Sequence, residues 1–267
     1  SMSRGLDYVI SCSLAMPGLI VAALGAPVGL WLVRGRVGVA AAAGALVVPC
    51  GVLAYAVTSG GDFMCFGRFL LPALPFLGLG LGALLSRIPA PAALGLGLLA
   101  IGGGAAATFD LHPVPVSIRR AFDVRHNQRL AGVTEARSEF AQWRNMTARA
   151  EEWARLGRAL RAHAPAGASL VYGAVGAVGY FSGLFIHDTN GLVTREVALR
   201  EAGPQLRSPG HDKMVPPTFF LKDDPDYLTA GVVQGAGLAA LRQRIGPVAV
   251  LGPTEAPGEV VWVLPRP

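Results

Sequence analysis

The chain has 267 residues, of which 52% are hydrophobic and 15% charged, and its mean hydropathy is +0.47. Such an apolar composition argues against an ordinary water-soluble protein and directs attention to membrane spans. The net charge of +6 includes no dense basic run, so nothing in the charge pattern supports binding to nucleic acid.

Charged residues are distributed unevenly along the chain. Residues 1–109 contain five basic and two acidic residues, whereas residues 110–267 contain 18 basic and 15 acidic residues. We therefore predict an α-helical transmembrane region over 1–109, followed by a soluble α/β domain over 110–267. All three cysteines lie in the first region and their spacing fits no zinc motif, so the sequence predicts no metal site.

The apolar region divides into four predicted spans, each close to the ~20 residues needed to cross ~30 Å of hydrocarbon. They cover about 8–33, 37–58, 67–86 and 90–109. Glycines at positions 78, 80, 82, 95 and 97 are expected to allow close helix contact.

Basic residues in the short loops indicate an orientation. Arg34 and Arg36 occupy the first loop and Arg87 the third, and loops rich in Lys and Arg face the cytoplasm. The loop at 60–68 and everything after Asp110 are then predicted to lie on the extracytoplasmic side.

Two charges in the loop at 60–68 stand between apolar runs. The simpler interpretation of Asp62 and Arg68 is a solvated turn between two helices. The functional interpretation is that Arg68 binds an anionic lipid head group, because a guanidinium matches phosphate oxygens in a two-pronged way. Asp62 would then orient the arginine or contact a polar group of the substrate.

Three sequence blocks support the functional interpretation. Residues 60–64 and 68–75 are similar to the "GGDFM…RFLLPALP" segment of bacterial GT-C-type membrane glycosyltransferases, in particular the mycobacterial terminal arabinofuranosyltransferase (AftB-like) group. Residues 179–183 and 188–198 resemble the "GYYSGL…D..GL.D..IA" pattern in the soluble tail of such proteins. Residues 209–213 resemble their "GHEK" segment.

The resemblance implies transfer of a sugar from a polyprenyl-phosphate donor to a cell-envelope glycan acceptor at a bacterial plasma membrane. It also implies that the chain is the C-terminal part of a longer enzyme, with the catalytic acid in a preceding region. The catalytic residue is therefore unknown, and no cofactor is certain beyond a divalent metal that the full-length enzyme could use. The alternative is a non-catalytic membrane-anchored module that binds envelope polysaccharide or a partner protein.

The second half shows the pattern of a small α/β domain. A helix is predicted over 134–164, with an apolar stripe that includes Leu156 and Leu160 and arginines on a solvated face or on lipid head groups. The segment "SLVYGAVGAVGYFSG" is predicted to form a strand, a Gly-rich turn and a short helix, and "LFIHDTNGL" to contain a second strand. Further strands are predicted at residues 227–229, "PVAVLG" and "VVWVLP", with helices over 192–202 and 237–245.

Five residues of this domain are predicted to bind substrate, mainly glycan. They are Tyr180, Asp188, Asn190, His211 and Lys213. Asp188 falls at the carboxyl end of a predicted strand, where open α/β sheets place ligands, although a turn or capping role also fits it. Thr189 or Asn190 is expected to cap the helix that follows. For His211, acid–base chemistry and a loop-anchoring role remain open.

Overall fold

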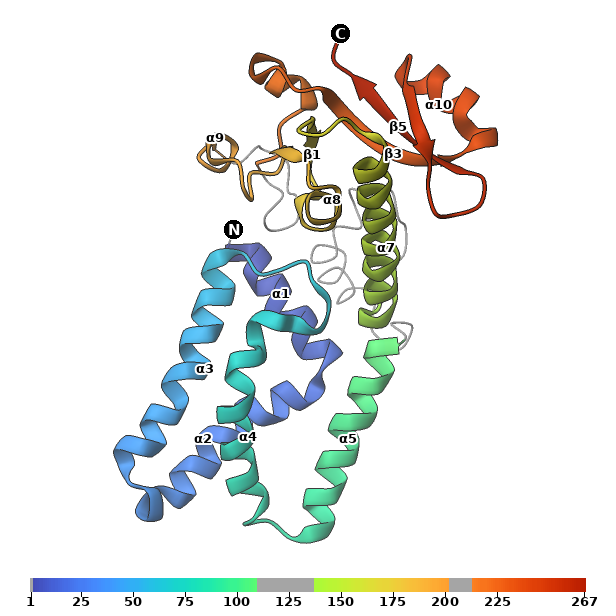
Figure 1. Ribbon diagram of the computed structural model, residues 1–267. Coiled ribbons are helices and arrows are strands. Elements are labelled where there is room, and N and C mark those ends of the chain that lie inside the picture. Colours follow the sequence, from blue (N-terminus) through green and yellow to red (C-terminus); the bar gives the residue numbers. More distant parts are fainter. Residues whose placement is uncertain (1, 110–136, 202–212) are drawn as a thin grey trace. The chain divides into compact units, whose positions relative to one another are not determined.

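The computed structural model describes residues 2–109, 137–201 and 213–267 (Figure 1). The described residues form two compact units, one that ends at Arg144 and one that begins at Asn145. The predicted class, apolar helices followed by a mixed α/β domain, is confirmed at this level.

The first unit is helical. Its helices are α1 (Met2–Ala15), α2 (Pro17–Val37), α3 (Val39–Ser59), the 3-10 segment η1 (Cys65–Ala73), α4 (Leu74–Leu85) and α5 (Ala90–Phe109). Among the described residues, three helices are long and apolar enough to cross a membrane, namely Pro17–Val37, Val39–Ser59 and Cys65–Leu85. They support the prediction of a multi-pass membrane protein.

The predicted first span, 8–33, is wrong as a single helix. The chain breaks at Met16, which has φ −131° and ψ 73°, and α2 starts at Pro17. Proline has no N–H and disfavours helical geometry in the residue before it, so Pro17 serves well as the first residue of a new helix. The fourth predicted span is helical as α5, but its described apolar stretch, Ala90–Ala106, is shorter than the other three.

Helices α2, α3, α4 and α5 of the first unit alternate in direction (Figure 1). The turn between α2 and α3 and the turn between α4 and α5 lie at one end of this unit, and the loop between α3 and η1 lies at the other (Figure 1). The two turns are those that contain or border Arg34, Arg36 and Arg87. This alternation agrees with the predicted grouping of the basic loops at one end of the unit.

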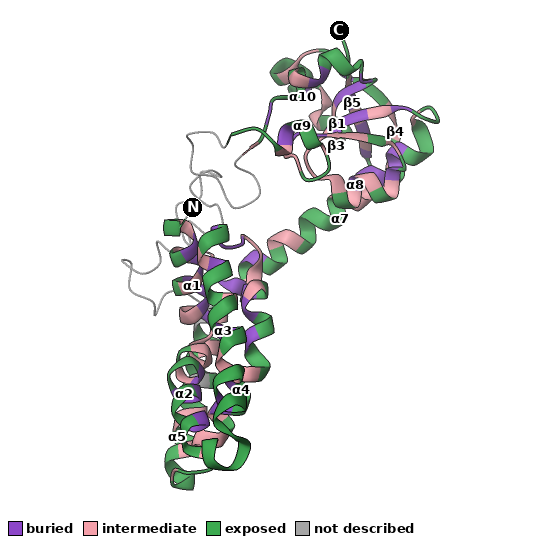
Figure 2. Cartoon of the chain, turned by 90° about the vertical axis from the view of Figure 1, so that its left-hand side faces the viewer, coloured by how far each residue is buried: buried purple, intermediate pink, exposed green. Residues whose placement is uncertain are grey.

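Much of the helical surface is apolar and exposed. Figure 2 shows α3 largely in the colour of exposed residues, which suits a helix that contacts lipid rather than water. The exposed side chains include Leu24, Trp31, Val47, Tyr55 and Leu79.

Helices α2 and α4 approach each other through glycine. A Cβ added to Gly80 would lie 2.5 Å from Cβ of Ala26, and one added to Gly29 would lie 1.9 Å from the carbonyl oxygen of Gly80. By contrast, a Cβ on Gly78 or Gly82 would meet nothing within 4 Å. The same holds for Gly95 and Gly97 on α5. Of the five glycines predicted to mediate helix contact, only Gly80 does so among the described residues, because its face of α4 turns to α2.

The second unit is built on a five-stranded sheet with the order β2-β1-β3-β5-β4. Strand β1 pairs parallel to both β2 and β3, whereas β5 pairs antiparallel to β3 and β4. The elements are α7 (Glu139–His163), β1 (Ser169–Tyr172), α8 (Val175–Ser182), β2 (Phe185–Asp188), α9 (Arg195–Ala198), η3 (Pro217–Asp223), β3 (Tyr227–Gln234), η4 (Gly235–Gly237), α10 (Leu238–Ile245), β4 (Ala249–Pro253) and β5 (Glu259–Pro265); α7 begins in the first unit.

The core of the second unit confirms the apolar stripe predicted for α7. Leu156 and Leu160 are buried together with Leu170 of β1, Val178 of α8 and Val261 of β5. The predicted helix over 192–202 is only the short α9, whereas the predicted strand at 227–229 is the longer β3.

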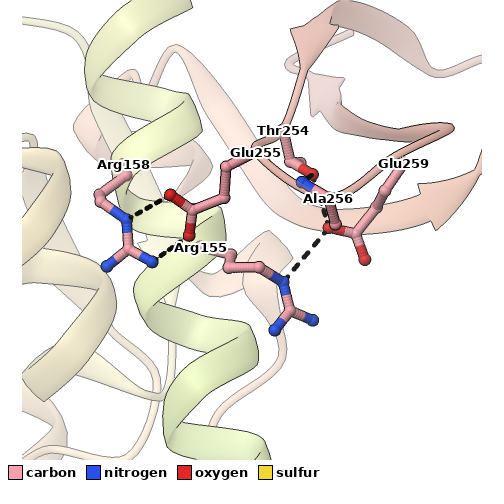
Figure 3. A network of polar contacts seen from close by, with 6 residues as sticks. All are labelled: Arg155, Arg158, Thr254, Glu255, Ala256 and Glu259. Carbon is pink, nitrogen blue, oxygen red and sulfur yellow. Dashed lines mark hydrogen bonds and ion pairs between the residues drawn. The ribbon is translucent and has the colours of Figure 1, made fainter.

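Arginines of α7 form ion pairs with the loop and strand that follow β4 (Figure 3). Arg158 donates two hydrogen bonds to Glu255, and Arg155 Nε lies 3.4 Å from Oε2 of Glu259. The hydrogen bond from Arg158 lowers the pKa of the Glu255 carboxyl. Part of the predicted solvated basic face of α7 therefore packs against its own domain, since these two arginines already have carboxylate partners.

Helix packing at Gly80 can be tested by adding one methyl group. Gly80→Ala should lower the melting temperature of the detergent-solubilised chain, because overpacking against Ala26 costs about 1–3 kcal/mol. Gly78→Ala, on the same helix with open space around it, should leave the melting temperature unchanged or raise it. Equal effects of the two variants would contradict the contact.

Candidate functional site

The loop between α3 and η1 starts with two glycines that its geometry requires. Gly60 ends α3 in the left-handed conformation (φ +88°, ψ +15°), and Gly61 has φ +75°. A Cβ on Gly61 would lie 2.4 Å from Cβ of Tyr8, on α1. The chain can thus turn sharply and pass directly over Tyr8, and Asp62 follows in a buried position.

Asp62 and Arg68 form a two-pronged ion pair across this loop. Arg68 Nε donates to Oδ2 of Asp62 at 2.5 Å, and Nη2 donates to Oδ1 at 3.2 Å. The Asp62 side chain is 3% exposed, whereas that of Arg68 is 51% exposed. The buried carboxylate fixes one edge of the guanidinium, and the exposed remainder of the side chain leaves N–H donors that an anion can reach.

The turn before Arg68 has unusual backbone geometry. Phe66 has φ +60° and ψ +19°, and Gly67 has φ +59° and ψ +42°. A left-handed conformation is uncommon for a residue with a side chain and is held only where its surroundings impose it. Here the Phe66 N–H donates to Oε2 of Glu139 at 2.5 Å.

Tyr8 holds the residue that follows Arg68 in the chain, Phe69. The backbone N–H of Phe69 donates to the Tyr8 hydroxyl at 3.1 Å, and the two rings meet edge to face with centroids 6.0 Å apart. The segment that bears Arg68 is therefore held by a tyrosine from α1 and by a glutamate from the first turn of α7.

Sequence reasoning did not identify Glu139. It lies 73 positions after Phe66 and is fully buried. In the sequence it is one acidic residue near the start of a predicted helix, a place where acids commonly interact with the helix dipole. The sequence did not reveal that Glu139 is buried, because no local pattern shows that a residue 73 positions earlier bonds to it.

The second group of predicted residues lies after β2. Asp188 is fully buried; its Oδ1 accepts from the N–H of Asn190 at 2.7 Å, and its Oδ2 accepts from the N–H groups of Leu192 and Val193. These contacts correspond to the turn role that the sequence left open. The carboxylate holds the loop between β2 and α9 in shape.

Asn190 belongs to the same turn. Its Nδ2 donates to the carbonyl oxygen of Gly173 at 2.8 Å, so it joins the loop after β2 to the loop after β1. Capping by Thr189 or Asn190 is wrong, because α9 begins only at Arg195 and its N-cap residue is Thr194.

The remaining predicted residues lie elsewhere. Tyr180, on α8, is 80% exposed, with its ring edge to face against Phe181. Lys213 Nζ donates to the carbonyl oxygen of Ala198 at the end of α9, at 2.5 Å. His211 lies outside the described residues. The structure thus brings Asp62 to Arg68 and Asp188 to Asn190, within separate units.

His187 of β2 lies between aromatic rings. Its ring centroid is 5.0 Å from that of Phe185 and 5.3 Å from that of Phe220. Burial lowers the pKa of His187, and the negative charge of Asp223 partly opposes this shift. Over the described ranges, no group of three or more His, Cys, Asp or Glu residues is arranged to hold a metal ion.

Comparison with known proteins matches only the second half of the chain to a family. Residues 139–258 match the model of a family described as a domain of unknown function, DUF8728. No curated protein and no solved structure matches the chain. The comparisons therefore show that residues 139–258 are similar to this domain family, and they identify no glycosyltransferase family.

The Glu139 contact can be tested by amide hydrogen exchange. Glu139→Ala should accelerate exchange in peptides covering residues 60–70, because a buried hydrogen bond to a charged acceptor contributes about 1.5–3 kcal/mol. Glu139→Gln, which keeps an acceptor oxygen, should show a smaller effect. Peptides of β1 serve as the internal control, and unchanged exchange in both variants would contradict the contact.

Stability should depend on pH through His187. A histidine whose pKa is lowered by folding binds protons more readily in the unfolded chain, so stability is present above the ordinary value of 6.5 and is lost as pH falls below it. Urea unfolding of the solubilised chain, followed by tryptophan fluorescence above and below this pH, measures the loss. His187→Gln should reduce the difference, and an unaltered difference would contradict this role.

Proposed function

We propose that this chain is the C-terminal region of an integral-membrane glycosyltransferase that uses a polyprenyl-phosphate-linked sugar to glycosylate a cell-envelope glycan. In this proposal Arg68 binds the phosphate of the donor. The observation that supports it is the half-exposed side chain of Arg68, whose guanidinium is held by the buried carboxylate of Asp62, at the start of the candidate span Cys65–Leu85. An arginine near the end of an apolar span reaches the membrane–water interface, where the phosphates of lipids lie.

The chemistry of the transfer suits an arginine in this position. The acceptor hydroxyl oxygen forms a bond to the anomeric carbon, the bond from that carbon to the phosphate oxygen breaks, and a base takes the hydroxyl proton. The departing polyprenyl phosphate gains negative charge as the bond breaks. A fixed guanidinium would stabilise this charge more in the transition state than in the bound donor, and only such a difference accelerates the chemical step.

Asp62 has two effects in this proposal. By occupying one edge of the guanidinium it fixes the orientation of Arg68 before the donor binds, which lowers the entropic cost of binding. Its negative charge also weakens the attraction of the site for anions. Because Asp62 weakens the attraction for free anions, the site favours an anion that gains binding energy from a second source. In a lipid phosphate this source is the tail, which remains in the bilayer while the phosphate contacts the open edge of the guanidinium.

The remaining parts of the proposal come from the sequence resemblance. The α/β unit would bind or guide the glycan acceptor on the extracytoplasmic side of a bacterial plasma membrane. The base would come from a region that precedes these spans in the full-length enzyme, and any divalent metal would bind there as well.

A second candidate function is a non-catalytic module that binds envelope polysaccharide. It is favoured by the exposure of Tyr180, together with the exposed ring of Phe185, since tyrosine rings are common at binding surfaces. Such a module would bind polysaccharide equally well with or without Arg68 and would show no turnover.

The role of Arg68 can be tested in the full-length protein. Arg68→Ala should weaken binding of polyprenyl phosphate at least tenfold, which corresponds to about 1.4 kcal/mol, and should reduce sugar transfer further. Arg68→Lys keeps the charge but cannot pair in two prongs with both Asp62 and phosphate, so it should lie between wild type and Arg68→Ala.

Native mass spectrometry with polyprenyl phosphate measures the binding, and a panel of polyprenyl-phosphate sugars measures transfer. Arg87→Ala provides the matched control, because this arginine lies by the turn between α4 and α5, at the other end of the helical unit. Wild-type binding and turnover in Arg68→Ala would exclude the phosphate role.

A further inference from the structure

Exposed apolar side chains gather on two segments of the α/β unit, residues 192–200 and 213–222, which we name the α9–η3 surface. A contiguous apolar patch on a soluble domain commonly marks a binding surface. The exposed apolar residues are Leu192, Val193, Leu199, Met214 and Leu221.

The two segments form one continuous surface. Lys213 donates to the carbonyl oxygen of Ala198, Lys222 forms an ion pair with Glu196, and the guanidinium of Arg200 lies 5.2 Å from the ring centroid of Phe219. Each contact joins the first segment to the second.

Both segments also rest on one apolar cluster. Val197 of the first segment and Val215 and Phe220 of the second are buried together against Val171 of β1 and Leu228 of β3. The exposed apolar residues of the two segments are not part of this cluster. The packed cluster beneath them fixes the backbone of both segments and so the shape of the surface.

The charge of the α9–η3 surface is positive. Its segments contain four basic residues and one acidic residue, and that acid, Glu196, is paired with Lys222. Three acidic residues, Glu201, Asp212 and Asp223, directly flank the two segments in the sequence, so the positive charge belongs to the segments themselves. Apolar side chains surrounded by lysine and arginine are typical of proteins that lie on the interface of an anionic membrane.

We propose that the α9–η3 surface docks on anionic phospholipid, with Leu192, Val193 and Leu199 in the interfacial layer and Arg195 and Arg200 on the head groups. Lipid suits this surface because the same polypeptide contains three candidate membrane spans. A domain tethered to membrane spans meets the bilayer at a high effective concentration, so a surface with a weak affinity for lipid is sufficient. This proposal does not depend on the role of Arg68.

The contact can be measured with a nitroxide label on the full chain in nanodiscs, with the native cysteines replaced. One label is placed at Leu199→Cys and a matched control at Val250→Cys, on β4 at the edge of the sheet away from β2. With phosphatidylglycerol present, the label at 199 should be several-fold less accessible to a water-soluble nickel chelate, and more accessible to oxygen, than the label at 250. In pure phosphatidylcholine the difference should shrink.

Charge reversal provides the second arm. Arg195→Glu together with Arg200→Glu should bring the label at 199 to the accessibility of the control in anionic nanodiscs, with no effect in neutral ones. Equal accessibility of the two labels in anionic nanodiscs without the reversal would overturn the proposal. Shielding at 199 that appears only when a soluble envelope polysaccharide is added would overturn it in favour of a glycan occupant. Normal protection of β1 and β3 amides confirms that each variant is folded.

Discussion

The arrangement of the helical unit depends on one buried carboxylate. An ionised Asp62 removed from water is costly unless it is paired and hydrogen-bonded, and Arg68 supplies both through two N–H donors. For Arg68 to reach it, the chain must turn sharply after α3 and pass over Tyr8, which only glycine permits at position 61. The left-handed turn at Phe66 then places Arg68 opposite Asp62.

The same constraint explains why distant parts of the chain meet at this loop. Tyr8 of α1 accepts from the N–H of Phe69, and Glu139 of α7 accepts from the N–H of Phe66. Backbone groups in an irregular loop lack the partners that a helix provides, so side chains from elsewhere must satisfy them. A rigid loop is also what the proposed phosphate site requires, because an arginine that is already oriented loses less entropy when it binds an anion.

The α/β unit uses its polar groups differently. Asp188, which the sequence placed where a ligand could bind, instead organises the loop that leads to α9, and Lys213 ties the end of α9 to the segment that follows. Arg155 and Arg158 join α7 to the loop and strand after β4. These contacts shape the exposed surfaces of the unit. The interactions proposed for the unit therefore involve two surfaces, the one that bears the exposed rings of Tyr180 and Phe185 and the basic, apolar α9–η3 surface.

The sequence by itself determined the apolar helices, predicted over about 37–58 and 67–86 and found at Val39–Ser59 and Cys65–Leu85. It also determined the stripe of α7 and the strands of the sheet, because hydropathy and periodicity are local properties. Only the tertiary structure decided that the chain breaks at Met16 while Pro27 stays within α2, and that Gly80 rather than Gly78 makes the helix contact. It likewise decided that Glu139 is buried beneath the loop of Arg68. Each of these depends on which residues distant in sequence become neighbours, and packing alone fixes that.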